Sequence, residues 1–220
     1  WSKWNQNLQL IASKSSNVVA SNNHYDADYV EYFSGVKPIY LPSHISMTGI
    51  LYTAESSDIL VAPLHTDVSD HGLNFGSEAI GRELRKLSPR FKQLRTKYKG
   101  HYSYAQLASN TAILHIPYQV SVMSLFEQYA MAIPLLVPTP EFLWTLHNEY
   151  NIMKERTWQQ QNTGKRERKS LLPPFLKDST VPDPNDDLTR EAFLFWVKKG
   201  DFWTFEHILT FDSWGPLQTI

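Results

Sequence analysis

The stretch "HIPYQVSVMSLFEQYAMAIPLLVPTPEF", residues 115–142, decides the fold class of this chain. It begins at the end of an apolar run, "TAILHIP" (111–117), continues through a helix-like segment at 122–131, and enters a second apolar run, "PLLVP" (134–138). Apolar runs of this length are typical of parallel strands covered on both faces, and parallel strands need a crossover such as a helix between them. The stretch therefore predicts a strand–helix–strand unit.

The same alternation extends in both directions from this unit. A further apolar run, "DILVAPL" (58–64), precedes a helical pattern that Ser77 is expected to cap. Near the N-terminus, a helical pattern at 26–34 lies between strand-like runs at 17–21 and 37–41. Strands that alternate with helices predict an α/β fold with a Rossmann-like, largely parallel sheet, preceded by a β-α-β fragment.

The chain is expected to contain two domains joined by a connection. Residues 42–57 carry Pro, Ser, Gly and Thr with little periodicity, as a connection does. We therefore predict an N-terminal α/β part at 1–57 and a second domain at 58–220. Within the second, "RTWQQQNTGKRERKS" (156–170) is polar and basic without apolar periodicity, so we interpret it as a solvated loop or frayed helix.

Two segments near the C-terminus complete the pattern. "DPNDDLTREAFLFWVKKG" (183–200) has an acidic start, an apolar centre and a Lys-Lys-Gly end, which predicts a helix. Its start is similar to a calcium loop, but Leu188 stands in place of the required Gly and Leu194 in place of the bidentate acid, so no calcium site is expected. We interpret "FWTFEHILTFDSW" (202–214) as a return of the chain onto the body of the protein.

Composition excludes several classes of partner. Lys and Arg together number 21 and Asp and Glu 22, so the net charge indicates neither nucleic acid nor an anionic membrane as a partner. The longest uninterrupted apolar runs, such as 133–137, are too short to span a bilayer, and we expect no membrane contact by this segment. The chain has no cysteine, so no disulfide contributes to its stability.

The same stretch, 115–142, also carries the candidate binding residues. Ligands of open parallel sheets bind beyond the carboxyl ends of the strands, and His115 and Tyr118 occupy such a place. A helix that begins near Ser121 or Ser124 presents free backbone N–H groups and the positive end of its dipole, which suits a phosphate. Glu127 lies one turn further, where its carboxylate can accept hydrogen bonds from ribose hydroxyls. A nucleotide would fit this arrangement.

A purely structural interpretation of the same residues stays open. "SLFE" is a Ser-x-x-Glu capping box, in which the first and fourth side chains hydrogen-bond each other's backbone N–H groups. Helix initiation alone would then explain Ser124 and Glu127.

The segment "SLFEQYAMAIPLLVPT" (124–139) resembles the donor-binding region of GT-B glycosyltransferases. In that family a Glu near the start of a helix is followed by a small-residue turn with Met and Pro and then by a short apolar strand. Here Glu127, Met131 and Pro134 match, and the resemblance implies that Glu127 contacts the ribose of a nucleotide sugar. The retaining enzymes have a second acid upstream, where this chain has Val120.

A further segment, "SNNHYDADYVEYFSGVKPIYLPS" (21–43), resembles the last β-α-β unit of the GT-B acceptor domain. The resemblance implies that 58–150 is the donor half, and that a nucleoside-diphosphate sugar and a glycan or glycoconjugate acceptor are the partners. Residues 1–57 are too few to build a complete acceptor domain, so we expect donor binding with little transfer by these 220 residues.

The loop "LHTDVSDHGLNFGSE" (64–78) would face the cleft of such an enzyme and hold the diphosphate. Its candidate ligand residues are His65, Asn74 and Ser77. Family members of this type generally use no bound metal or other cofactor, and none is expected here. A metal site built from the His and Asp residues of the loop is the alternative, although their spacing matches no recognised ligand pattern.

Two other functional classes remain open from the sequence. A non-catalytic nucleotide- or carbohydrate-binding α/β module would use the Glu127 site without a catalytic base. A structural interaction domain would keep the fold without any ligand. Seven Trp and eleven Tyr fit carbohydrate contact, because aromatic faces stack on sugar rings, but for any one of them ordinary core or surface packing is the more common explanation.

Overall fold

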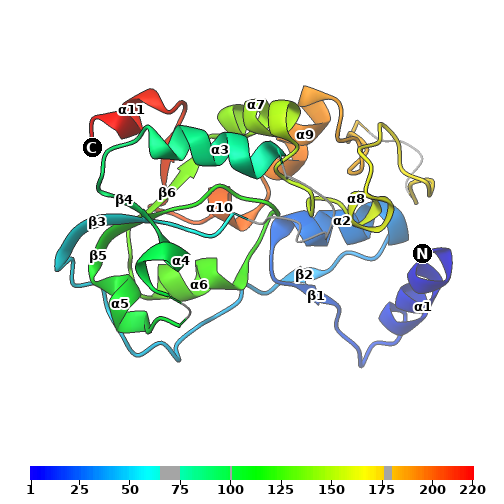
Figure 1. Cartoon of the computed structure of the whole chain (residues 1–220). Helices are drawn as coiled ribbons and strands as arrows, with labels where there is room; N and C mark the ends of the chain where they lie inside the picture. The colour runs from blue at the N-terminus through cyan, green and yellow to red at the C-terminus, as the bar shows by residue number, and fades with distance from the viewer. Residues whose placement is uncertain (65–74, 100, 176–179) are drawn as a thin grey trace. The chain divides into compact units, whose positions relative to one another are not determined.

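The computed structural model of the chain describes residues 1–64, 75–99, 101–175 and 180–220. These residues form two compact units, each built from two stretches of chain (Figure 1). The first unit comprises 1–43 and 155–204, and the second comprises 44–154 and 205–220, each without the gaps just named.

The second unit contains a five-stranded, all-parallel sheet with the order β4-β3-β5-β6-β7. Its strands are β3 (Ser56–Val61), β4 (Phe91–Gln93), β5 (Asn110–Leu114), β6 (Leu135–Pro138) and β7 (Leu209–Phe211). Its helices are α3 (Phe75–Arg85), α4 (Leu94–Lys97), α5 (Tyr104–Ala108), α6 (Met123–Ala130), α7 (Pro140–Tyr150) and α11 (Gly215–Gln218). The α/β class and the parallel sheet are thereby confirmed, and the arrangement is consistent with a Rossmann-like fold.

Helices cover both faces of this sheet, with α3 and α7 on one side and α4, α5 and α6 on the other (Figure 1). Alternate residues of each strand face opposite sides, so β5 buries Ala112 and Leu114 toward the first side and Ile113 toward the second. The core on the first side includes Ile80 of α3 and Leu146 of α7. Burial on both faces is why these strands read as unbroken apolar runs.

The strand order contains one reversal of direction. β4 follows β3 in the chain and pairs with one edge of β3. The chain then returns past β3, so that β5 pairs with the opposite edge of β3, and β6 and β7 are added outward from β5. The carboxyl ends of β3 and β5 therefore flank the topological switch point, the place where open α/β sheets bind their ligands.

The first unit contains the predicted β-α-β fragment. Its strands, β1 (Ala20–Ser21) and β2 (Ile39–Tyr40), pair in parallel on either side of α2 (His24–Ser34). The remaining helices are α1 (Ser2–Ala12), α8 (Trp158–Thr163), α9 (Arg190–Val197) and α10 (Asp201–Thr204).

Local signals set the ends of α2. The side chain of Asn23 accepts a hydrogen bond from the backbone N–H of Asp26 and so caps the helix start. Gly35 ends the helix with φ at 71°, in the left-handed region, and a Cβ there would collide with the ring of Phe175. Two amides of α1 complete the end, because Asn5 and Gln9 donate hydrogen bonds to the carbonyls of residues 33 and 34.

Long-range contacts explain why 155–204 belongs with 1–43. The hydroxyl of Tyr25 donates to the carbonyl of Arg156 at 2.9 Å, and the hydroxyl of Tyr29 donates to Asn185 at 3.0 Å. The guanidinium of Arg156 is buried and lies 2.8 Å from the buried carboxylate of Asp187. The compact units therefore divide the chain differently from the predicted boundary after residue 57.

The polar segment 156–170 agrees only in part with its predicted solvated state, since 161–165 and 168–169 are exposed but its first residues are mostly buried. Arg156, Gln159 and Gln160 are buried, and 158–163 form helix α8. Charge and amide content predicted solvent exposure, but the side chains of Arg156 and Gln159 bond to partners in 169–187 that the local pattern does not contain. No described helix has both the length and the apolar character that crossing a membrane requires.

Candidate functional site

The candidate site lies at the carboxyl edge of the sheet in the second unit. β3 ends at Val61 and β5 ends at Leu114, and the backbone N–H of Ala62 donates to the carbonyl of Leu114 at 2.8 Å. The two strands that flank the switch point are thus joined where they end. Among the candidates, His115, Tyr118, Ser121, Ser124 and Glu127 follow β5 within one connection and one helix.

His115 is the first residue beyond β5, and its ring is buried. Its Nε2 lies 2.6 Å from Oε1 of Gln128 on α6, which is also buried. Burial lowers the pKa of His115 to about 4, and the hydrogen bond to Gln128 opposes part of that shift. At neutral pH the ring is therefore uncharged and cannot act as a cation for a phosphate. Its hydrogen bond to Gln128 instead connects the end of β5 to α6.

The start of α6 rules out the capping-box interpretation. The N-cap residue is Val122, and no side chain makes a cap hydrogen bond there. Ser124 is already the second residue of the helix, and Glu127 is the fifth, so neither occupies a capping-box position. The local pattern was misleading because α6 begins at Met123, one residue before the predicted Ser.

The serines around this helix start are half-buried. Among the described residues, neither Ser121 nor Ser124 has a hydrogen-bond partner for its hydroxyl. The first backbone N–H groups of a helix have no intrahelical acceptor, and the dipole is positive at this end. The start of α6 therefore offers hydroxyl and amide donors of the kind that a phosphate accepts.

Glu127 is half-buried and is held by a residue that the sequence analysis did not identify. The hydroxyl of Tyr104, the first residue of α5, donates to Oε1 of Glu127 at 3.0 Å. Among the described residues, Oε2 of Glu127 has no hydrogen-bond partner. This hydrogen bond is the main reason that the pKa of Tyr104 is raised above its ordinary value. The hydrogen bond to Oε1 thus orients the Glu127 carboxylate, and Oε2 is available to accept hydrogen bonds from a ligand.

Tyr118 is half-buried and lies in the connection from β5 to α6. Its hydroxyl accepts a hydrogen bond from the side chain of Gln119 at 3.3 Å. The side chain is therefore at the same connection as His115, and its direct contact with a nucleotide stays a prediction.

Of the candidates in the loop 64–78, only Ser77 belongs to the described residues. His65 and Asn74 lie outside the described residues. Ser77 lies inside α3, which begins at Phe75, so the prediction that Ser77 caps this helix is wrong. The helix starts earlier than the apolar spacing indicated, because that spacing marks only the residues that face the core.

Carboxylates elsewhere are engaged within the protein. Asp183 accepts hydrogen bonds from the backbone N–H groups of Ser170 and Asn185, and Asp187 is paired with Arg156 and Arg166. Hydrogen bonds and ion pairs within the protein therefore explain the acidic residues at 183–187 whose spacing resembles a calcium loop. Within the described part of the chain, no three His, Asp or Glu residues are grouped so that they could hold a metal ion.

Comparison with protein-family models, with curated proteins and with solved structures found no significant match to this chain. The fold and the site thus define an α/β protein with a parallel sheet and a polar group at its switch point, and its function has to be argued from those residues.

Proposed function

We propose that this chain is the donor-binding part of a GT-B-like glycosyltransferase, which transfers a sugar from a nucleoside-diphosphate sugar to a hydroxyl of a glycan or glycoconjugate acceptor. The observation that carries the proposal is the Glu127 carboxylate, which is oriented by Tyr104 and has one oxygen available on the helix that follows β5. A carboxylate with a free oxygen accepts hydrogen bonds from the two vicinal hydroxyls of a ribose.

Two further features support a nucleotide at this place. β3 and β5 flank the topological switch point, where doubly wound α/β proteins bind their ligands. Helix α6 points its N-terminal amides toward the same edge as the end of β5, and Ser121 and Ser124 add hydroxyl donors. In the proposed complex the ribose contacts Glu127, and the diphosphate lies between the start of α6 and the segment after β3.

The proposed transfer is a substitution at the anomeric carbon. The bond from that carbon to the diphosphate oxygen breaks, a new bond forms to the acceptor oxygen, and the proton of the acceptor hydroxyl passes to a base. The nucleoside diphosphate leaves with the bonding electron pair, and amide and hydroxyl donors at a helix start stabilise its developing charge. No residue of this chain is assigned as the base.

Calorimetric titration with uridine diphosphate, guanosine diphosphate and the corresponding nucleosides tests the proposal. The diphosphates should bind more tightly than the nucleosides, because the helix start supplies donors only to phosphate. Glu127→Gln should weaken diphosphate binding by about 1 to 3 kcal/mol, the scale of one charge-assisted hydrogen bond.

Glu149→Gln is a matched control for that measurement. Glu149 is also a helix glutamate hydrogen-bonded to a tyrosine, Tyr150, but it lies near the far end of α7 from the carboxyl edge of the sheet. Binding should be unchanged in this variant. If no diphosphate binds, or if both variants bind like the wild type, Glu127 does not form a nucleotide site. Turnover with labelled nucleotide sugars then separates an enzyme from a non-catalytic binding module.

A further inference from the structure

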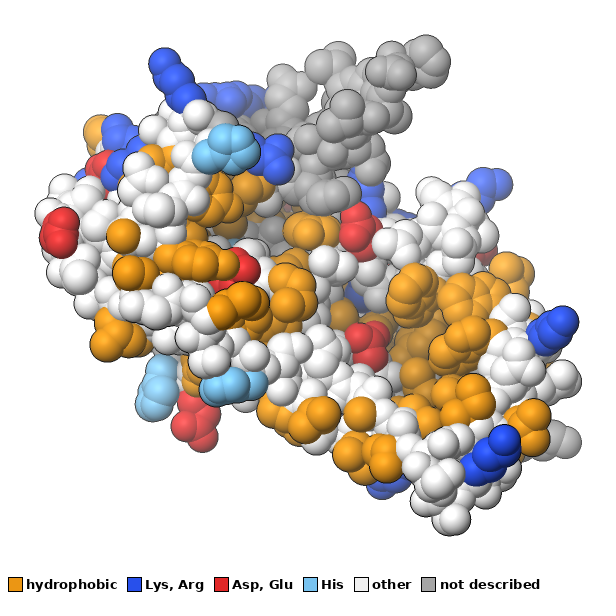
Figure 2. All heavy atoms as spheres, turned by 90° about the horizontal axis from the view of Figure 1, so that it is seen from below, with side chains coloured by type: hydrophobic (Ala, Val, Ile, Leu, Met, Phe, Trp, Pro, Cys, Tyr) orange, Lys and Arg blue, Asp and Glu red, His pale blue; other side chains and the backbone are white. Residues whose placement is uncertain are grey.

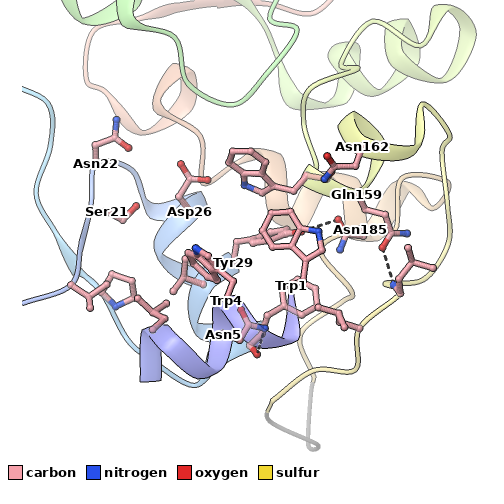
Figure 3. A pocket seen from close by; sticks show the side chains of 18 of the residues that line it. Trp1, Trp4, Asn5, Ser21, Asn22, Asp26, Tyr29, Gln159, Asn162 and Asn185 are labelled. Atoms are coloured by element: carbon pink, nitrogen blue, oxygen red, sulfur yellow. Dashed lines mark hydrogen bonds between the residues drawn. The ribbon is translucent and has the colours of Figure 1, made fainter. Parts of the chain in front are cut away.

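The first unit contains a pocket of about 730 Å³, within the range of small-molecule sites. Every residue that lines it belongs to this unit. They come from α1, from β1 and the residues beside it, from α2, from segments around α8, and from Pro38 and Asn185. Figure 2 shows hydrophobic side chains gathered over the face of the unit that carries α1, β1 and β2. Figure 3 shows the pocket itself, with aromatic side chains in the middle of the view.

Three tryptophans define the aromatic part of this pocket. The side chains of Trp1, Trp4 and Trp158 are 56%, 48% and 51% exposed. The ring centroid of Trp1 lies 6.2 Å from that of Trp4 and 6.0 Å from that of Trp158, at interplanar angles of 71° and 56°. The rings therefore meet edge to face or at a tilt and are not stacked face to face.

Such a cluster is unusual on a protein surface. Tryptophan is among the most buried residues on average, and a contiguous exposed apolar patch marks an interaction site. Trp196, in the same unit, shows the ordinary state, since it is 1% exposed and its indole N–H donates to the carbonyl of Pro182. The three half-exposed rings thus differ from a packed core residue of the same unit.

Polar groups interleave with these rings, and several of their acceptor oxygens are available for hydrogen bonds. Asp26 accepts from Asn23 through Oδ2, and its Oδ1 has no partner among the described residues. The amide nitrogens of Asn5 and Asn162 donate to backbone carbonyls, which fixes the orientation of both amides. Their Oδ1 atoms likewise have no partner in the described part of the chain. Figure 3 shows Asp26 and Ser21 on one side of Trp1 and Asn162 and Gln159 on the other.

We propose that this pocket binds a carbohydrate, with a pyranose ring packed on the indole faces of Trp1, Trp4 or Trp158 and its hydroxyls donating to Asp26, Asn5 and Asn162. A pyranose has an apolar C–H face and a rim of hydroxyl donors, so it can contact the aromatic rings and the few acceptor oxygens of this mainly apolar lining at once. The proposal does not rest on the nucleotide site, because Glu127 and its neighbours belong to the other unit.

Other ligand classes fit the lining less well. A wholly apolar ligand would cover the acceptor oxygens of Asp26 and Asn5 without giving either a partner, which opposes binding. An anion would meet the Asp26 carboxylate and no Lys or Arg, since none lines the pocket among the described residues. A quaternary ammonium ion would suit the rings and Asp26 but would leave the amide oxygens without donors.

The indole N–H signals of ¹⁵N-labelled protein report on this pocket directly. We would titrate the 220-residue chain with linear pentasaccharides of glucose, N-acetylglucosamine, mannose and galactose, and with tetramethylammonium. At least one saccharide should shift the signals assigned to Trp1, Trp4 and Trp158, while the signal of the buried Trp196 stays unchanged. Trp→Phe variants assign the signals.

The saccharide affinities of two variants distinguish specific binding in this pocket from nonspecific contact with exposed aromatic rings. Trp158→Ala removes a half-exposed ring and should lower the saccharide affinity about tenfold. Phe195→Ala removes an aromatic ring of the same unit that is 37% exposed but does not line the pocket, and it should leave the affinity unchanged. Equal loss in both variants, shifts with tetramethylammonium alone, or no shift with any saccharide would each overturn the proposal. Parallel titration with uridine and guanosine diphosphates reports on the other unit, so the two proposals fail separately.

Discussion

The hydroxyl of Tyr104 donates a hydrogen bond to Oε1 of Glu127 over 3.0 Å and thereby joins α5 to α6. The two residues are 23 positions apart, and β5 lies between them in the chain. Tyr104 is a positioning residue in the proposed nucleotide site, since it orients the carboxylate that would contact the ribose.

Tyr104→Phe should therefore lower the affinity for nucleoside diphosphates by about 0.5 to 1.5 kcal/mol, the net value of one hydrogen bond. Calorimetric titration measures this effect, and thermal unfolding should be nearly unchanged because the pair is only partly buried. Tyr102→Phe is the matched control, since Tyr102 is an exposed tyrosine two residues earlier. The same loss of affinity in both variants would contradict the role of Tyr104.

His115 should make the stability of the protein depend on pH. Its pKa falls from about 6.5 in the unfolded chain to about 4 in the folded protein, so the unfolded state binds more protons between these values. Stability should accordingly decrease as the pH falls from about 6.5 toward about 4, by up to roughly 1.4 kcal/mol per pH unit.

Chemical denaturation at a series of pH values tests this expectation. His115→Gln removes the titrating ring and should flatten the pH dependence in this window, whereas substitution of the exposed His44 by Gln should not. Asp and Glu carboxylates also titrate near the lower end of this window, but they are the same in the wild type and in both variants, so a difference between the three curves reports on the histidines. Parallel curves for the wild type and His115→Gln would show that His115 is not the group responsible.

Arg156 and Asp187 should be more important for stability than any surface ion pair. Both side chains are buried, with Nε 2.8 Å from Oδ1, and removing one partner leaves the other charge inside the protein. Arg156→Met should destabilise the first unit by about 3 to 5 kcal/mol in denaturant unfolding. Lys86→Met breaks the exposed pair with Glu83 and should cost at most about 1 kcal/mol. Similar losses in the two variants would be inconsistent with a buried network.

The C-terminal strand β7 should be an integral part of the sheet. Phe211 is 5% exposed and packs with Phe142 of α7, so Phe211→Ala should destabilise the second unit by about 3 to 5 kcal/mol. Leu209 lies on the same strand but is 55% exposed, and Leu209→Ala should change the stability by no more than about 0.5 kcal/mol. Denaturant unfolding compares them, and a small effect of Phe211→Ala would mean that β7 does not contribute to the core.

The sequence by itself determined those elements whose signals are local. The apolar runs predicted β3, β5 and β6, and the helical patterns predicted α2 and α6 within a few residues. The alternation of these elements was sufficient to predict a parallel α/β sheet. Such signals lie within one or two turns or one strand, so they can be read without knowing what the element packs against.

The local signals failed where two structures share one pattern. Ser124 and Glu127 have the spacing of a capping box, but α6 begins at Met123, and Val122 is its N-cap. Spacing cannot distinguish a cap from the interior of the first turn, because the difference lies in the backbone angles of the preceding residues.

Only the tertiary structure decided which distant residues meet. Tyr104 donates a hydrogen bond to Glu127, and β7 pairs with β6 in the sheet. Arg156 is hydrogen-bonded to Asp187, which is 31 positions away. The aromatic pocket likewise combines Trp1 and Trp4 with Trp158. Each of these contacts depends on the path of the whole chain, since a side chain's chemistry shows what kind of partner it requires but not which residue supplies it. The candidate residues were therefore readable from the sequence, whereas their partners, their burial and the division into two units followed from packing alone.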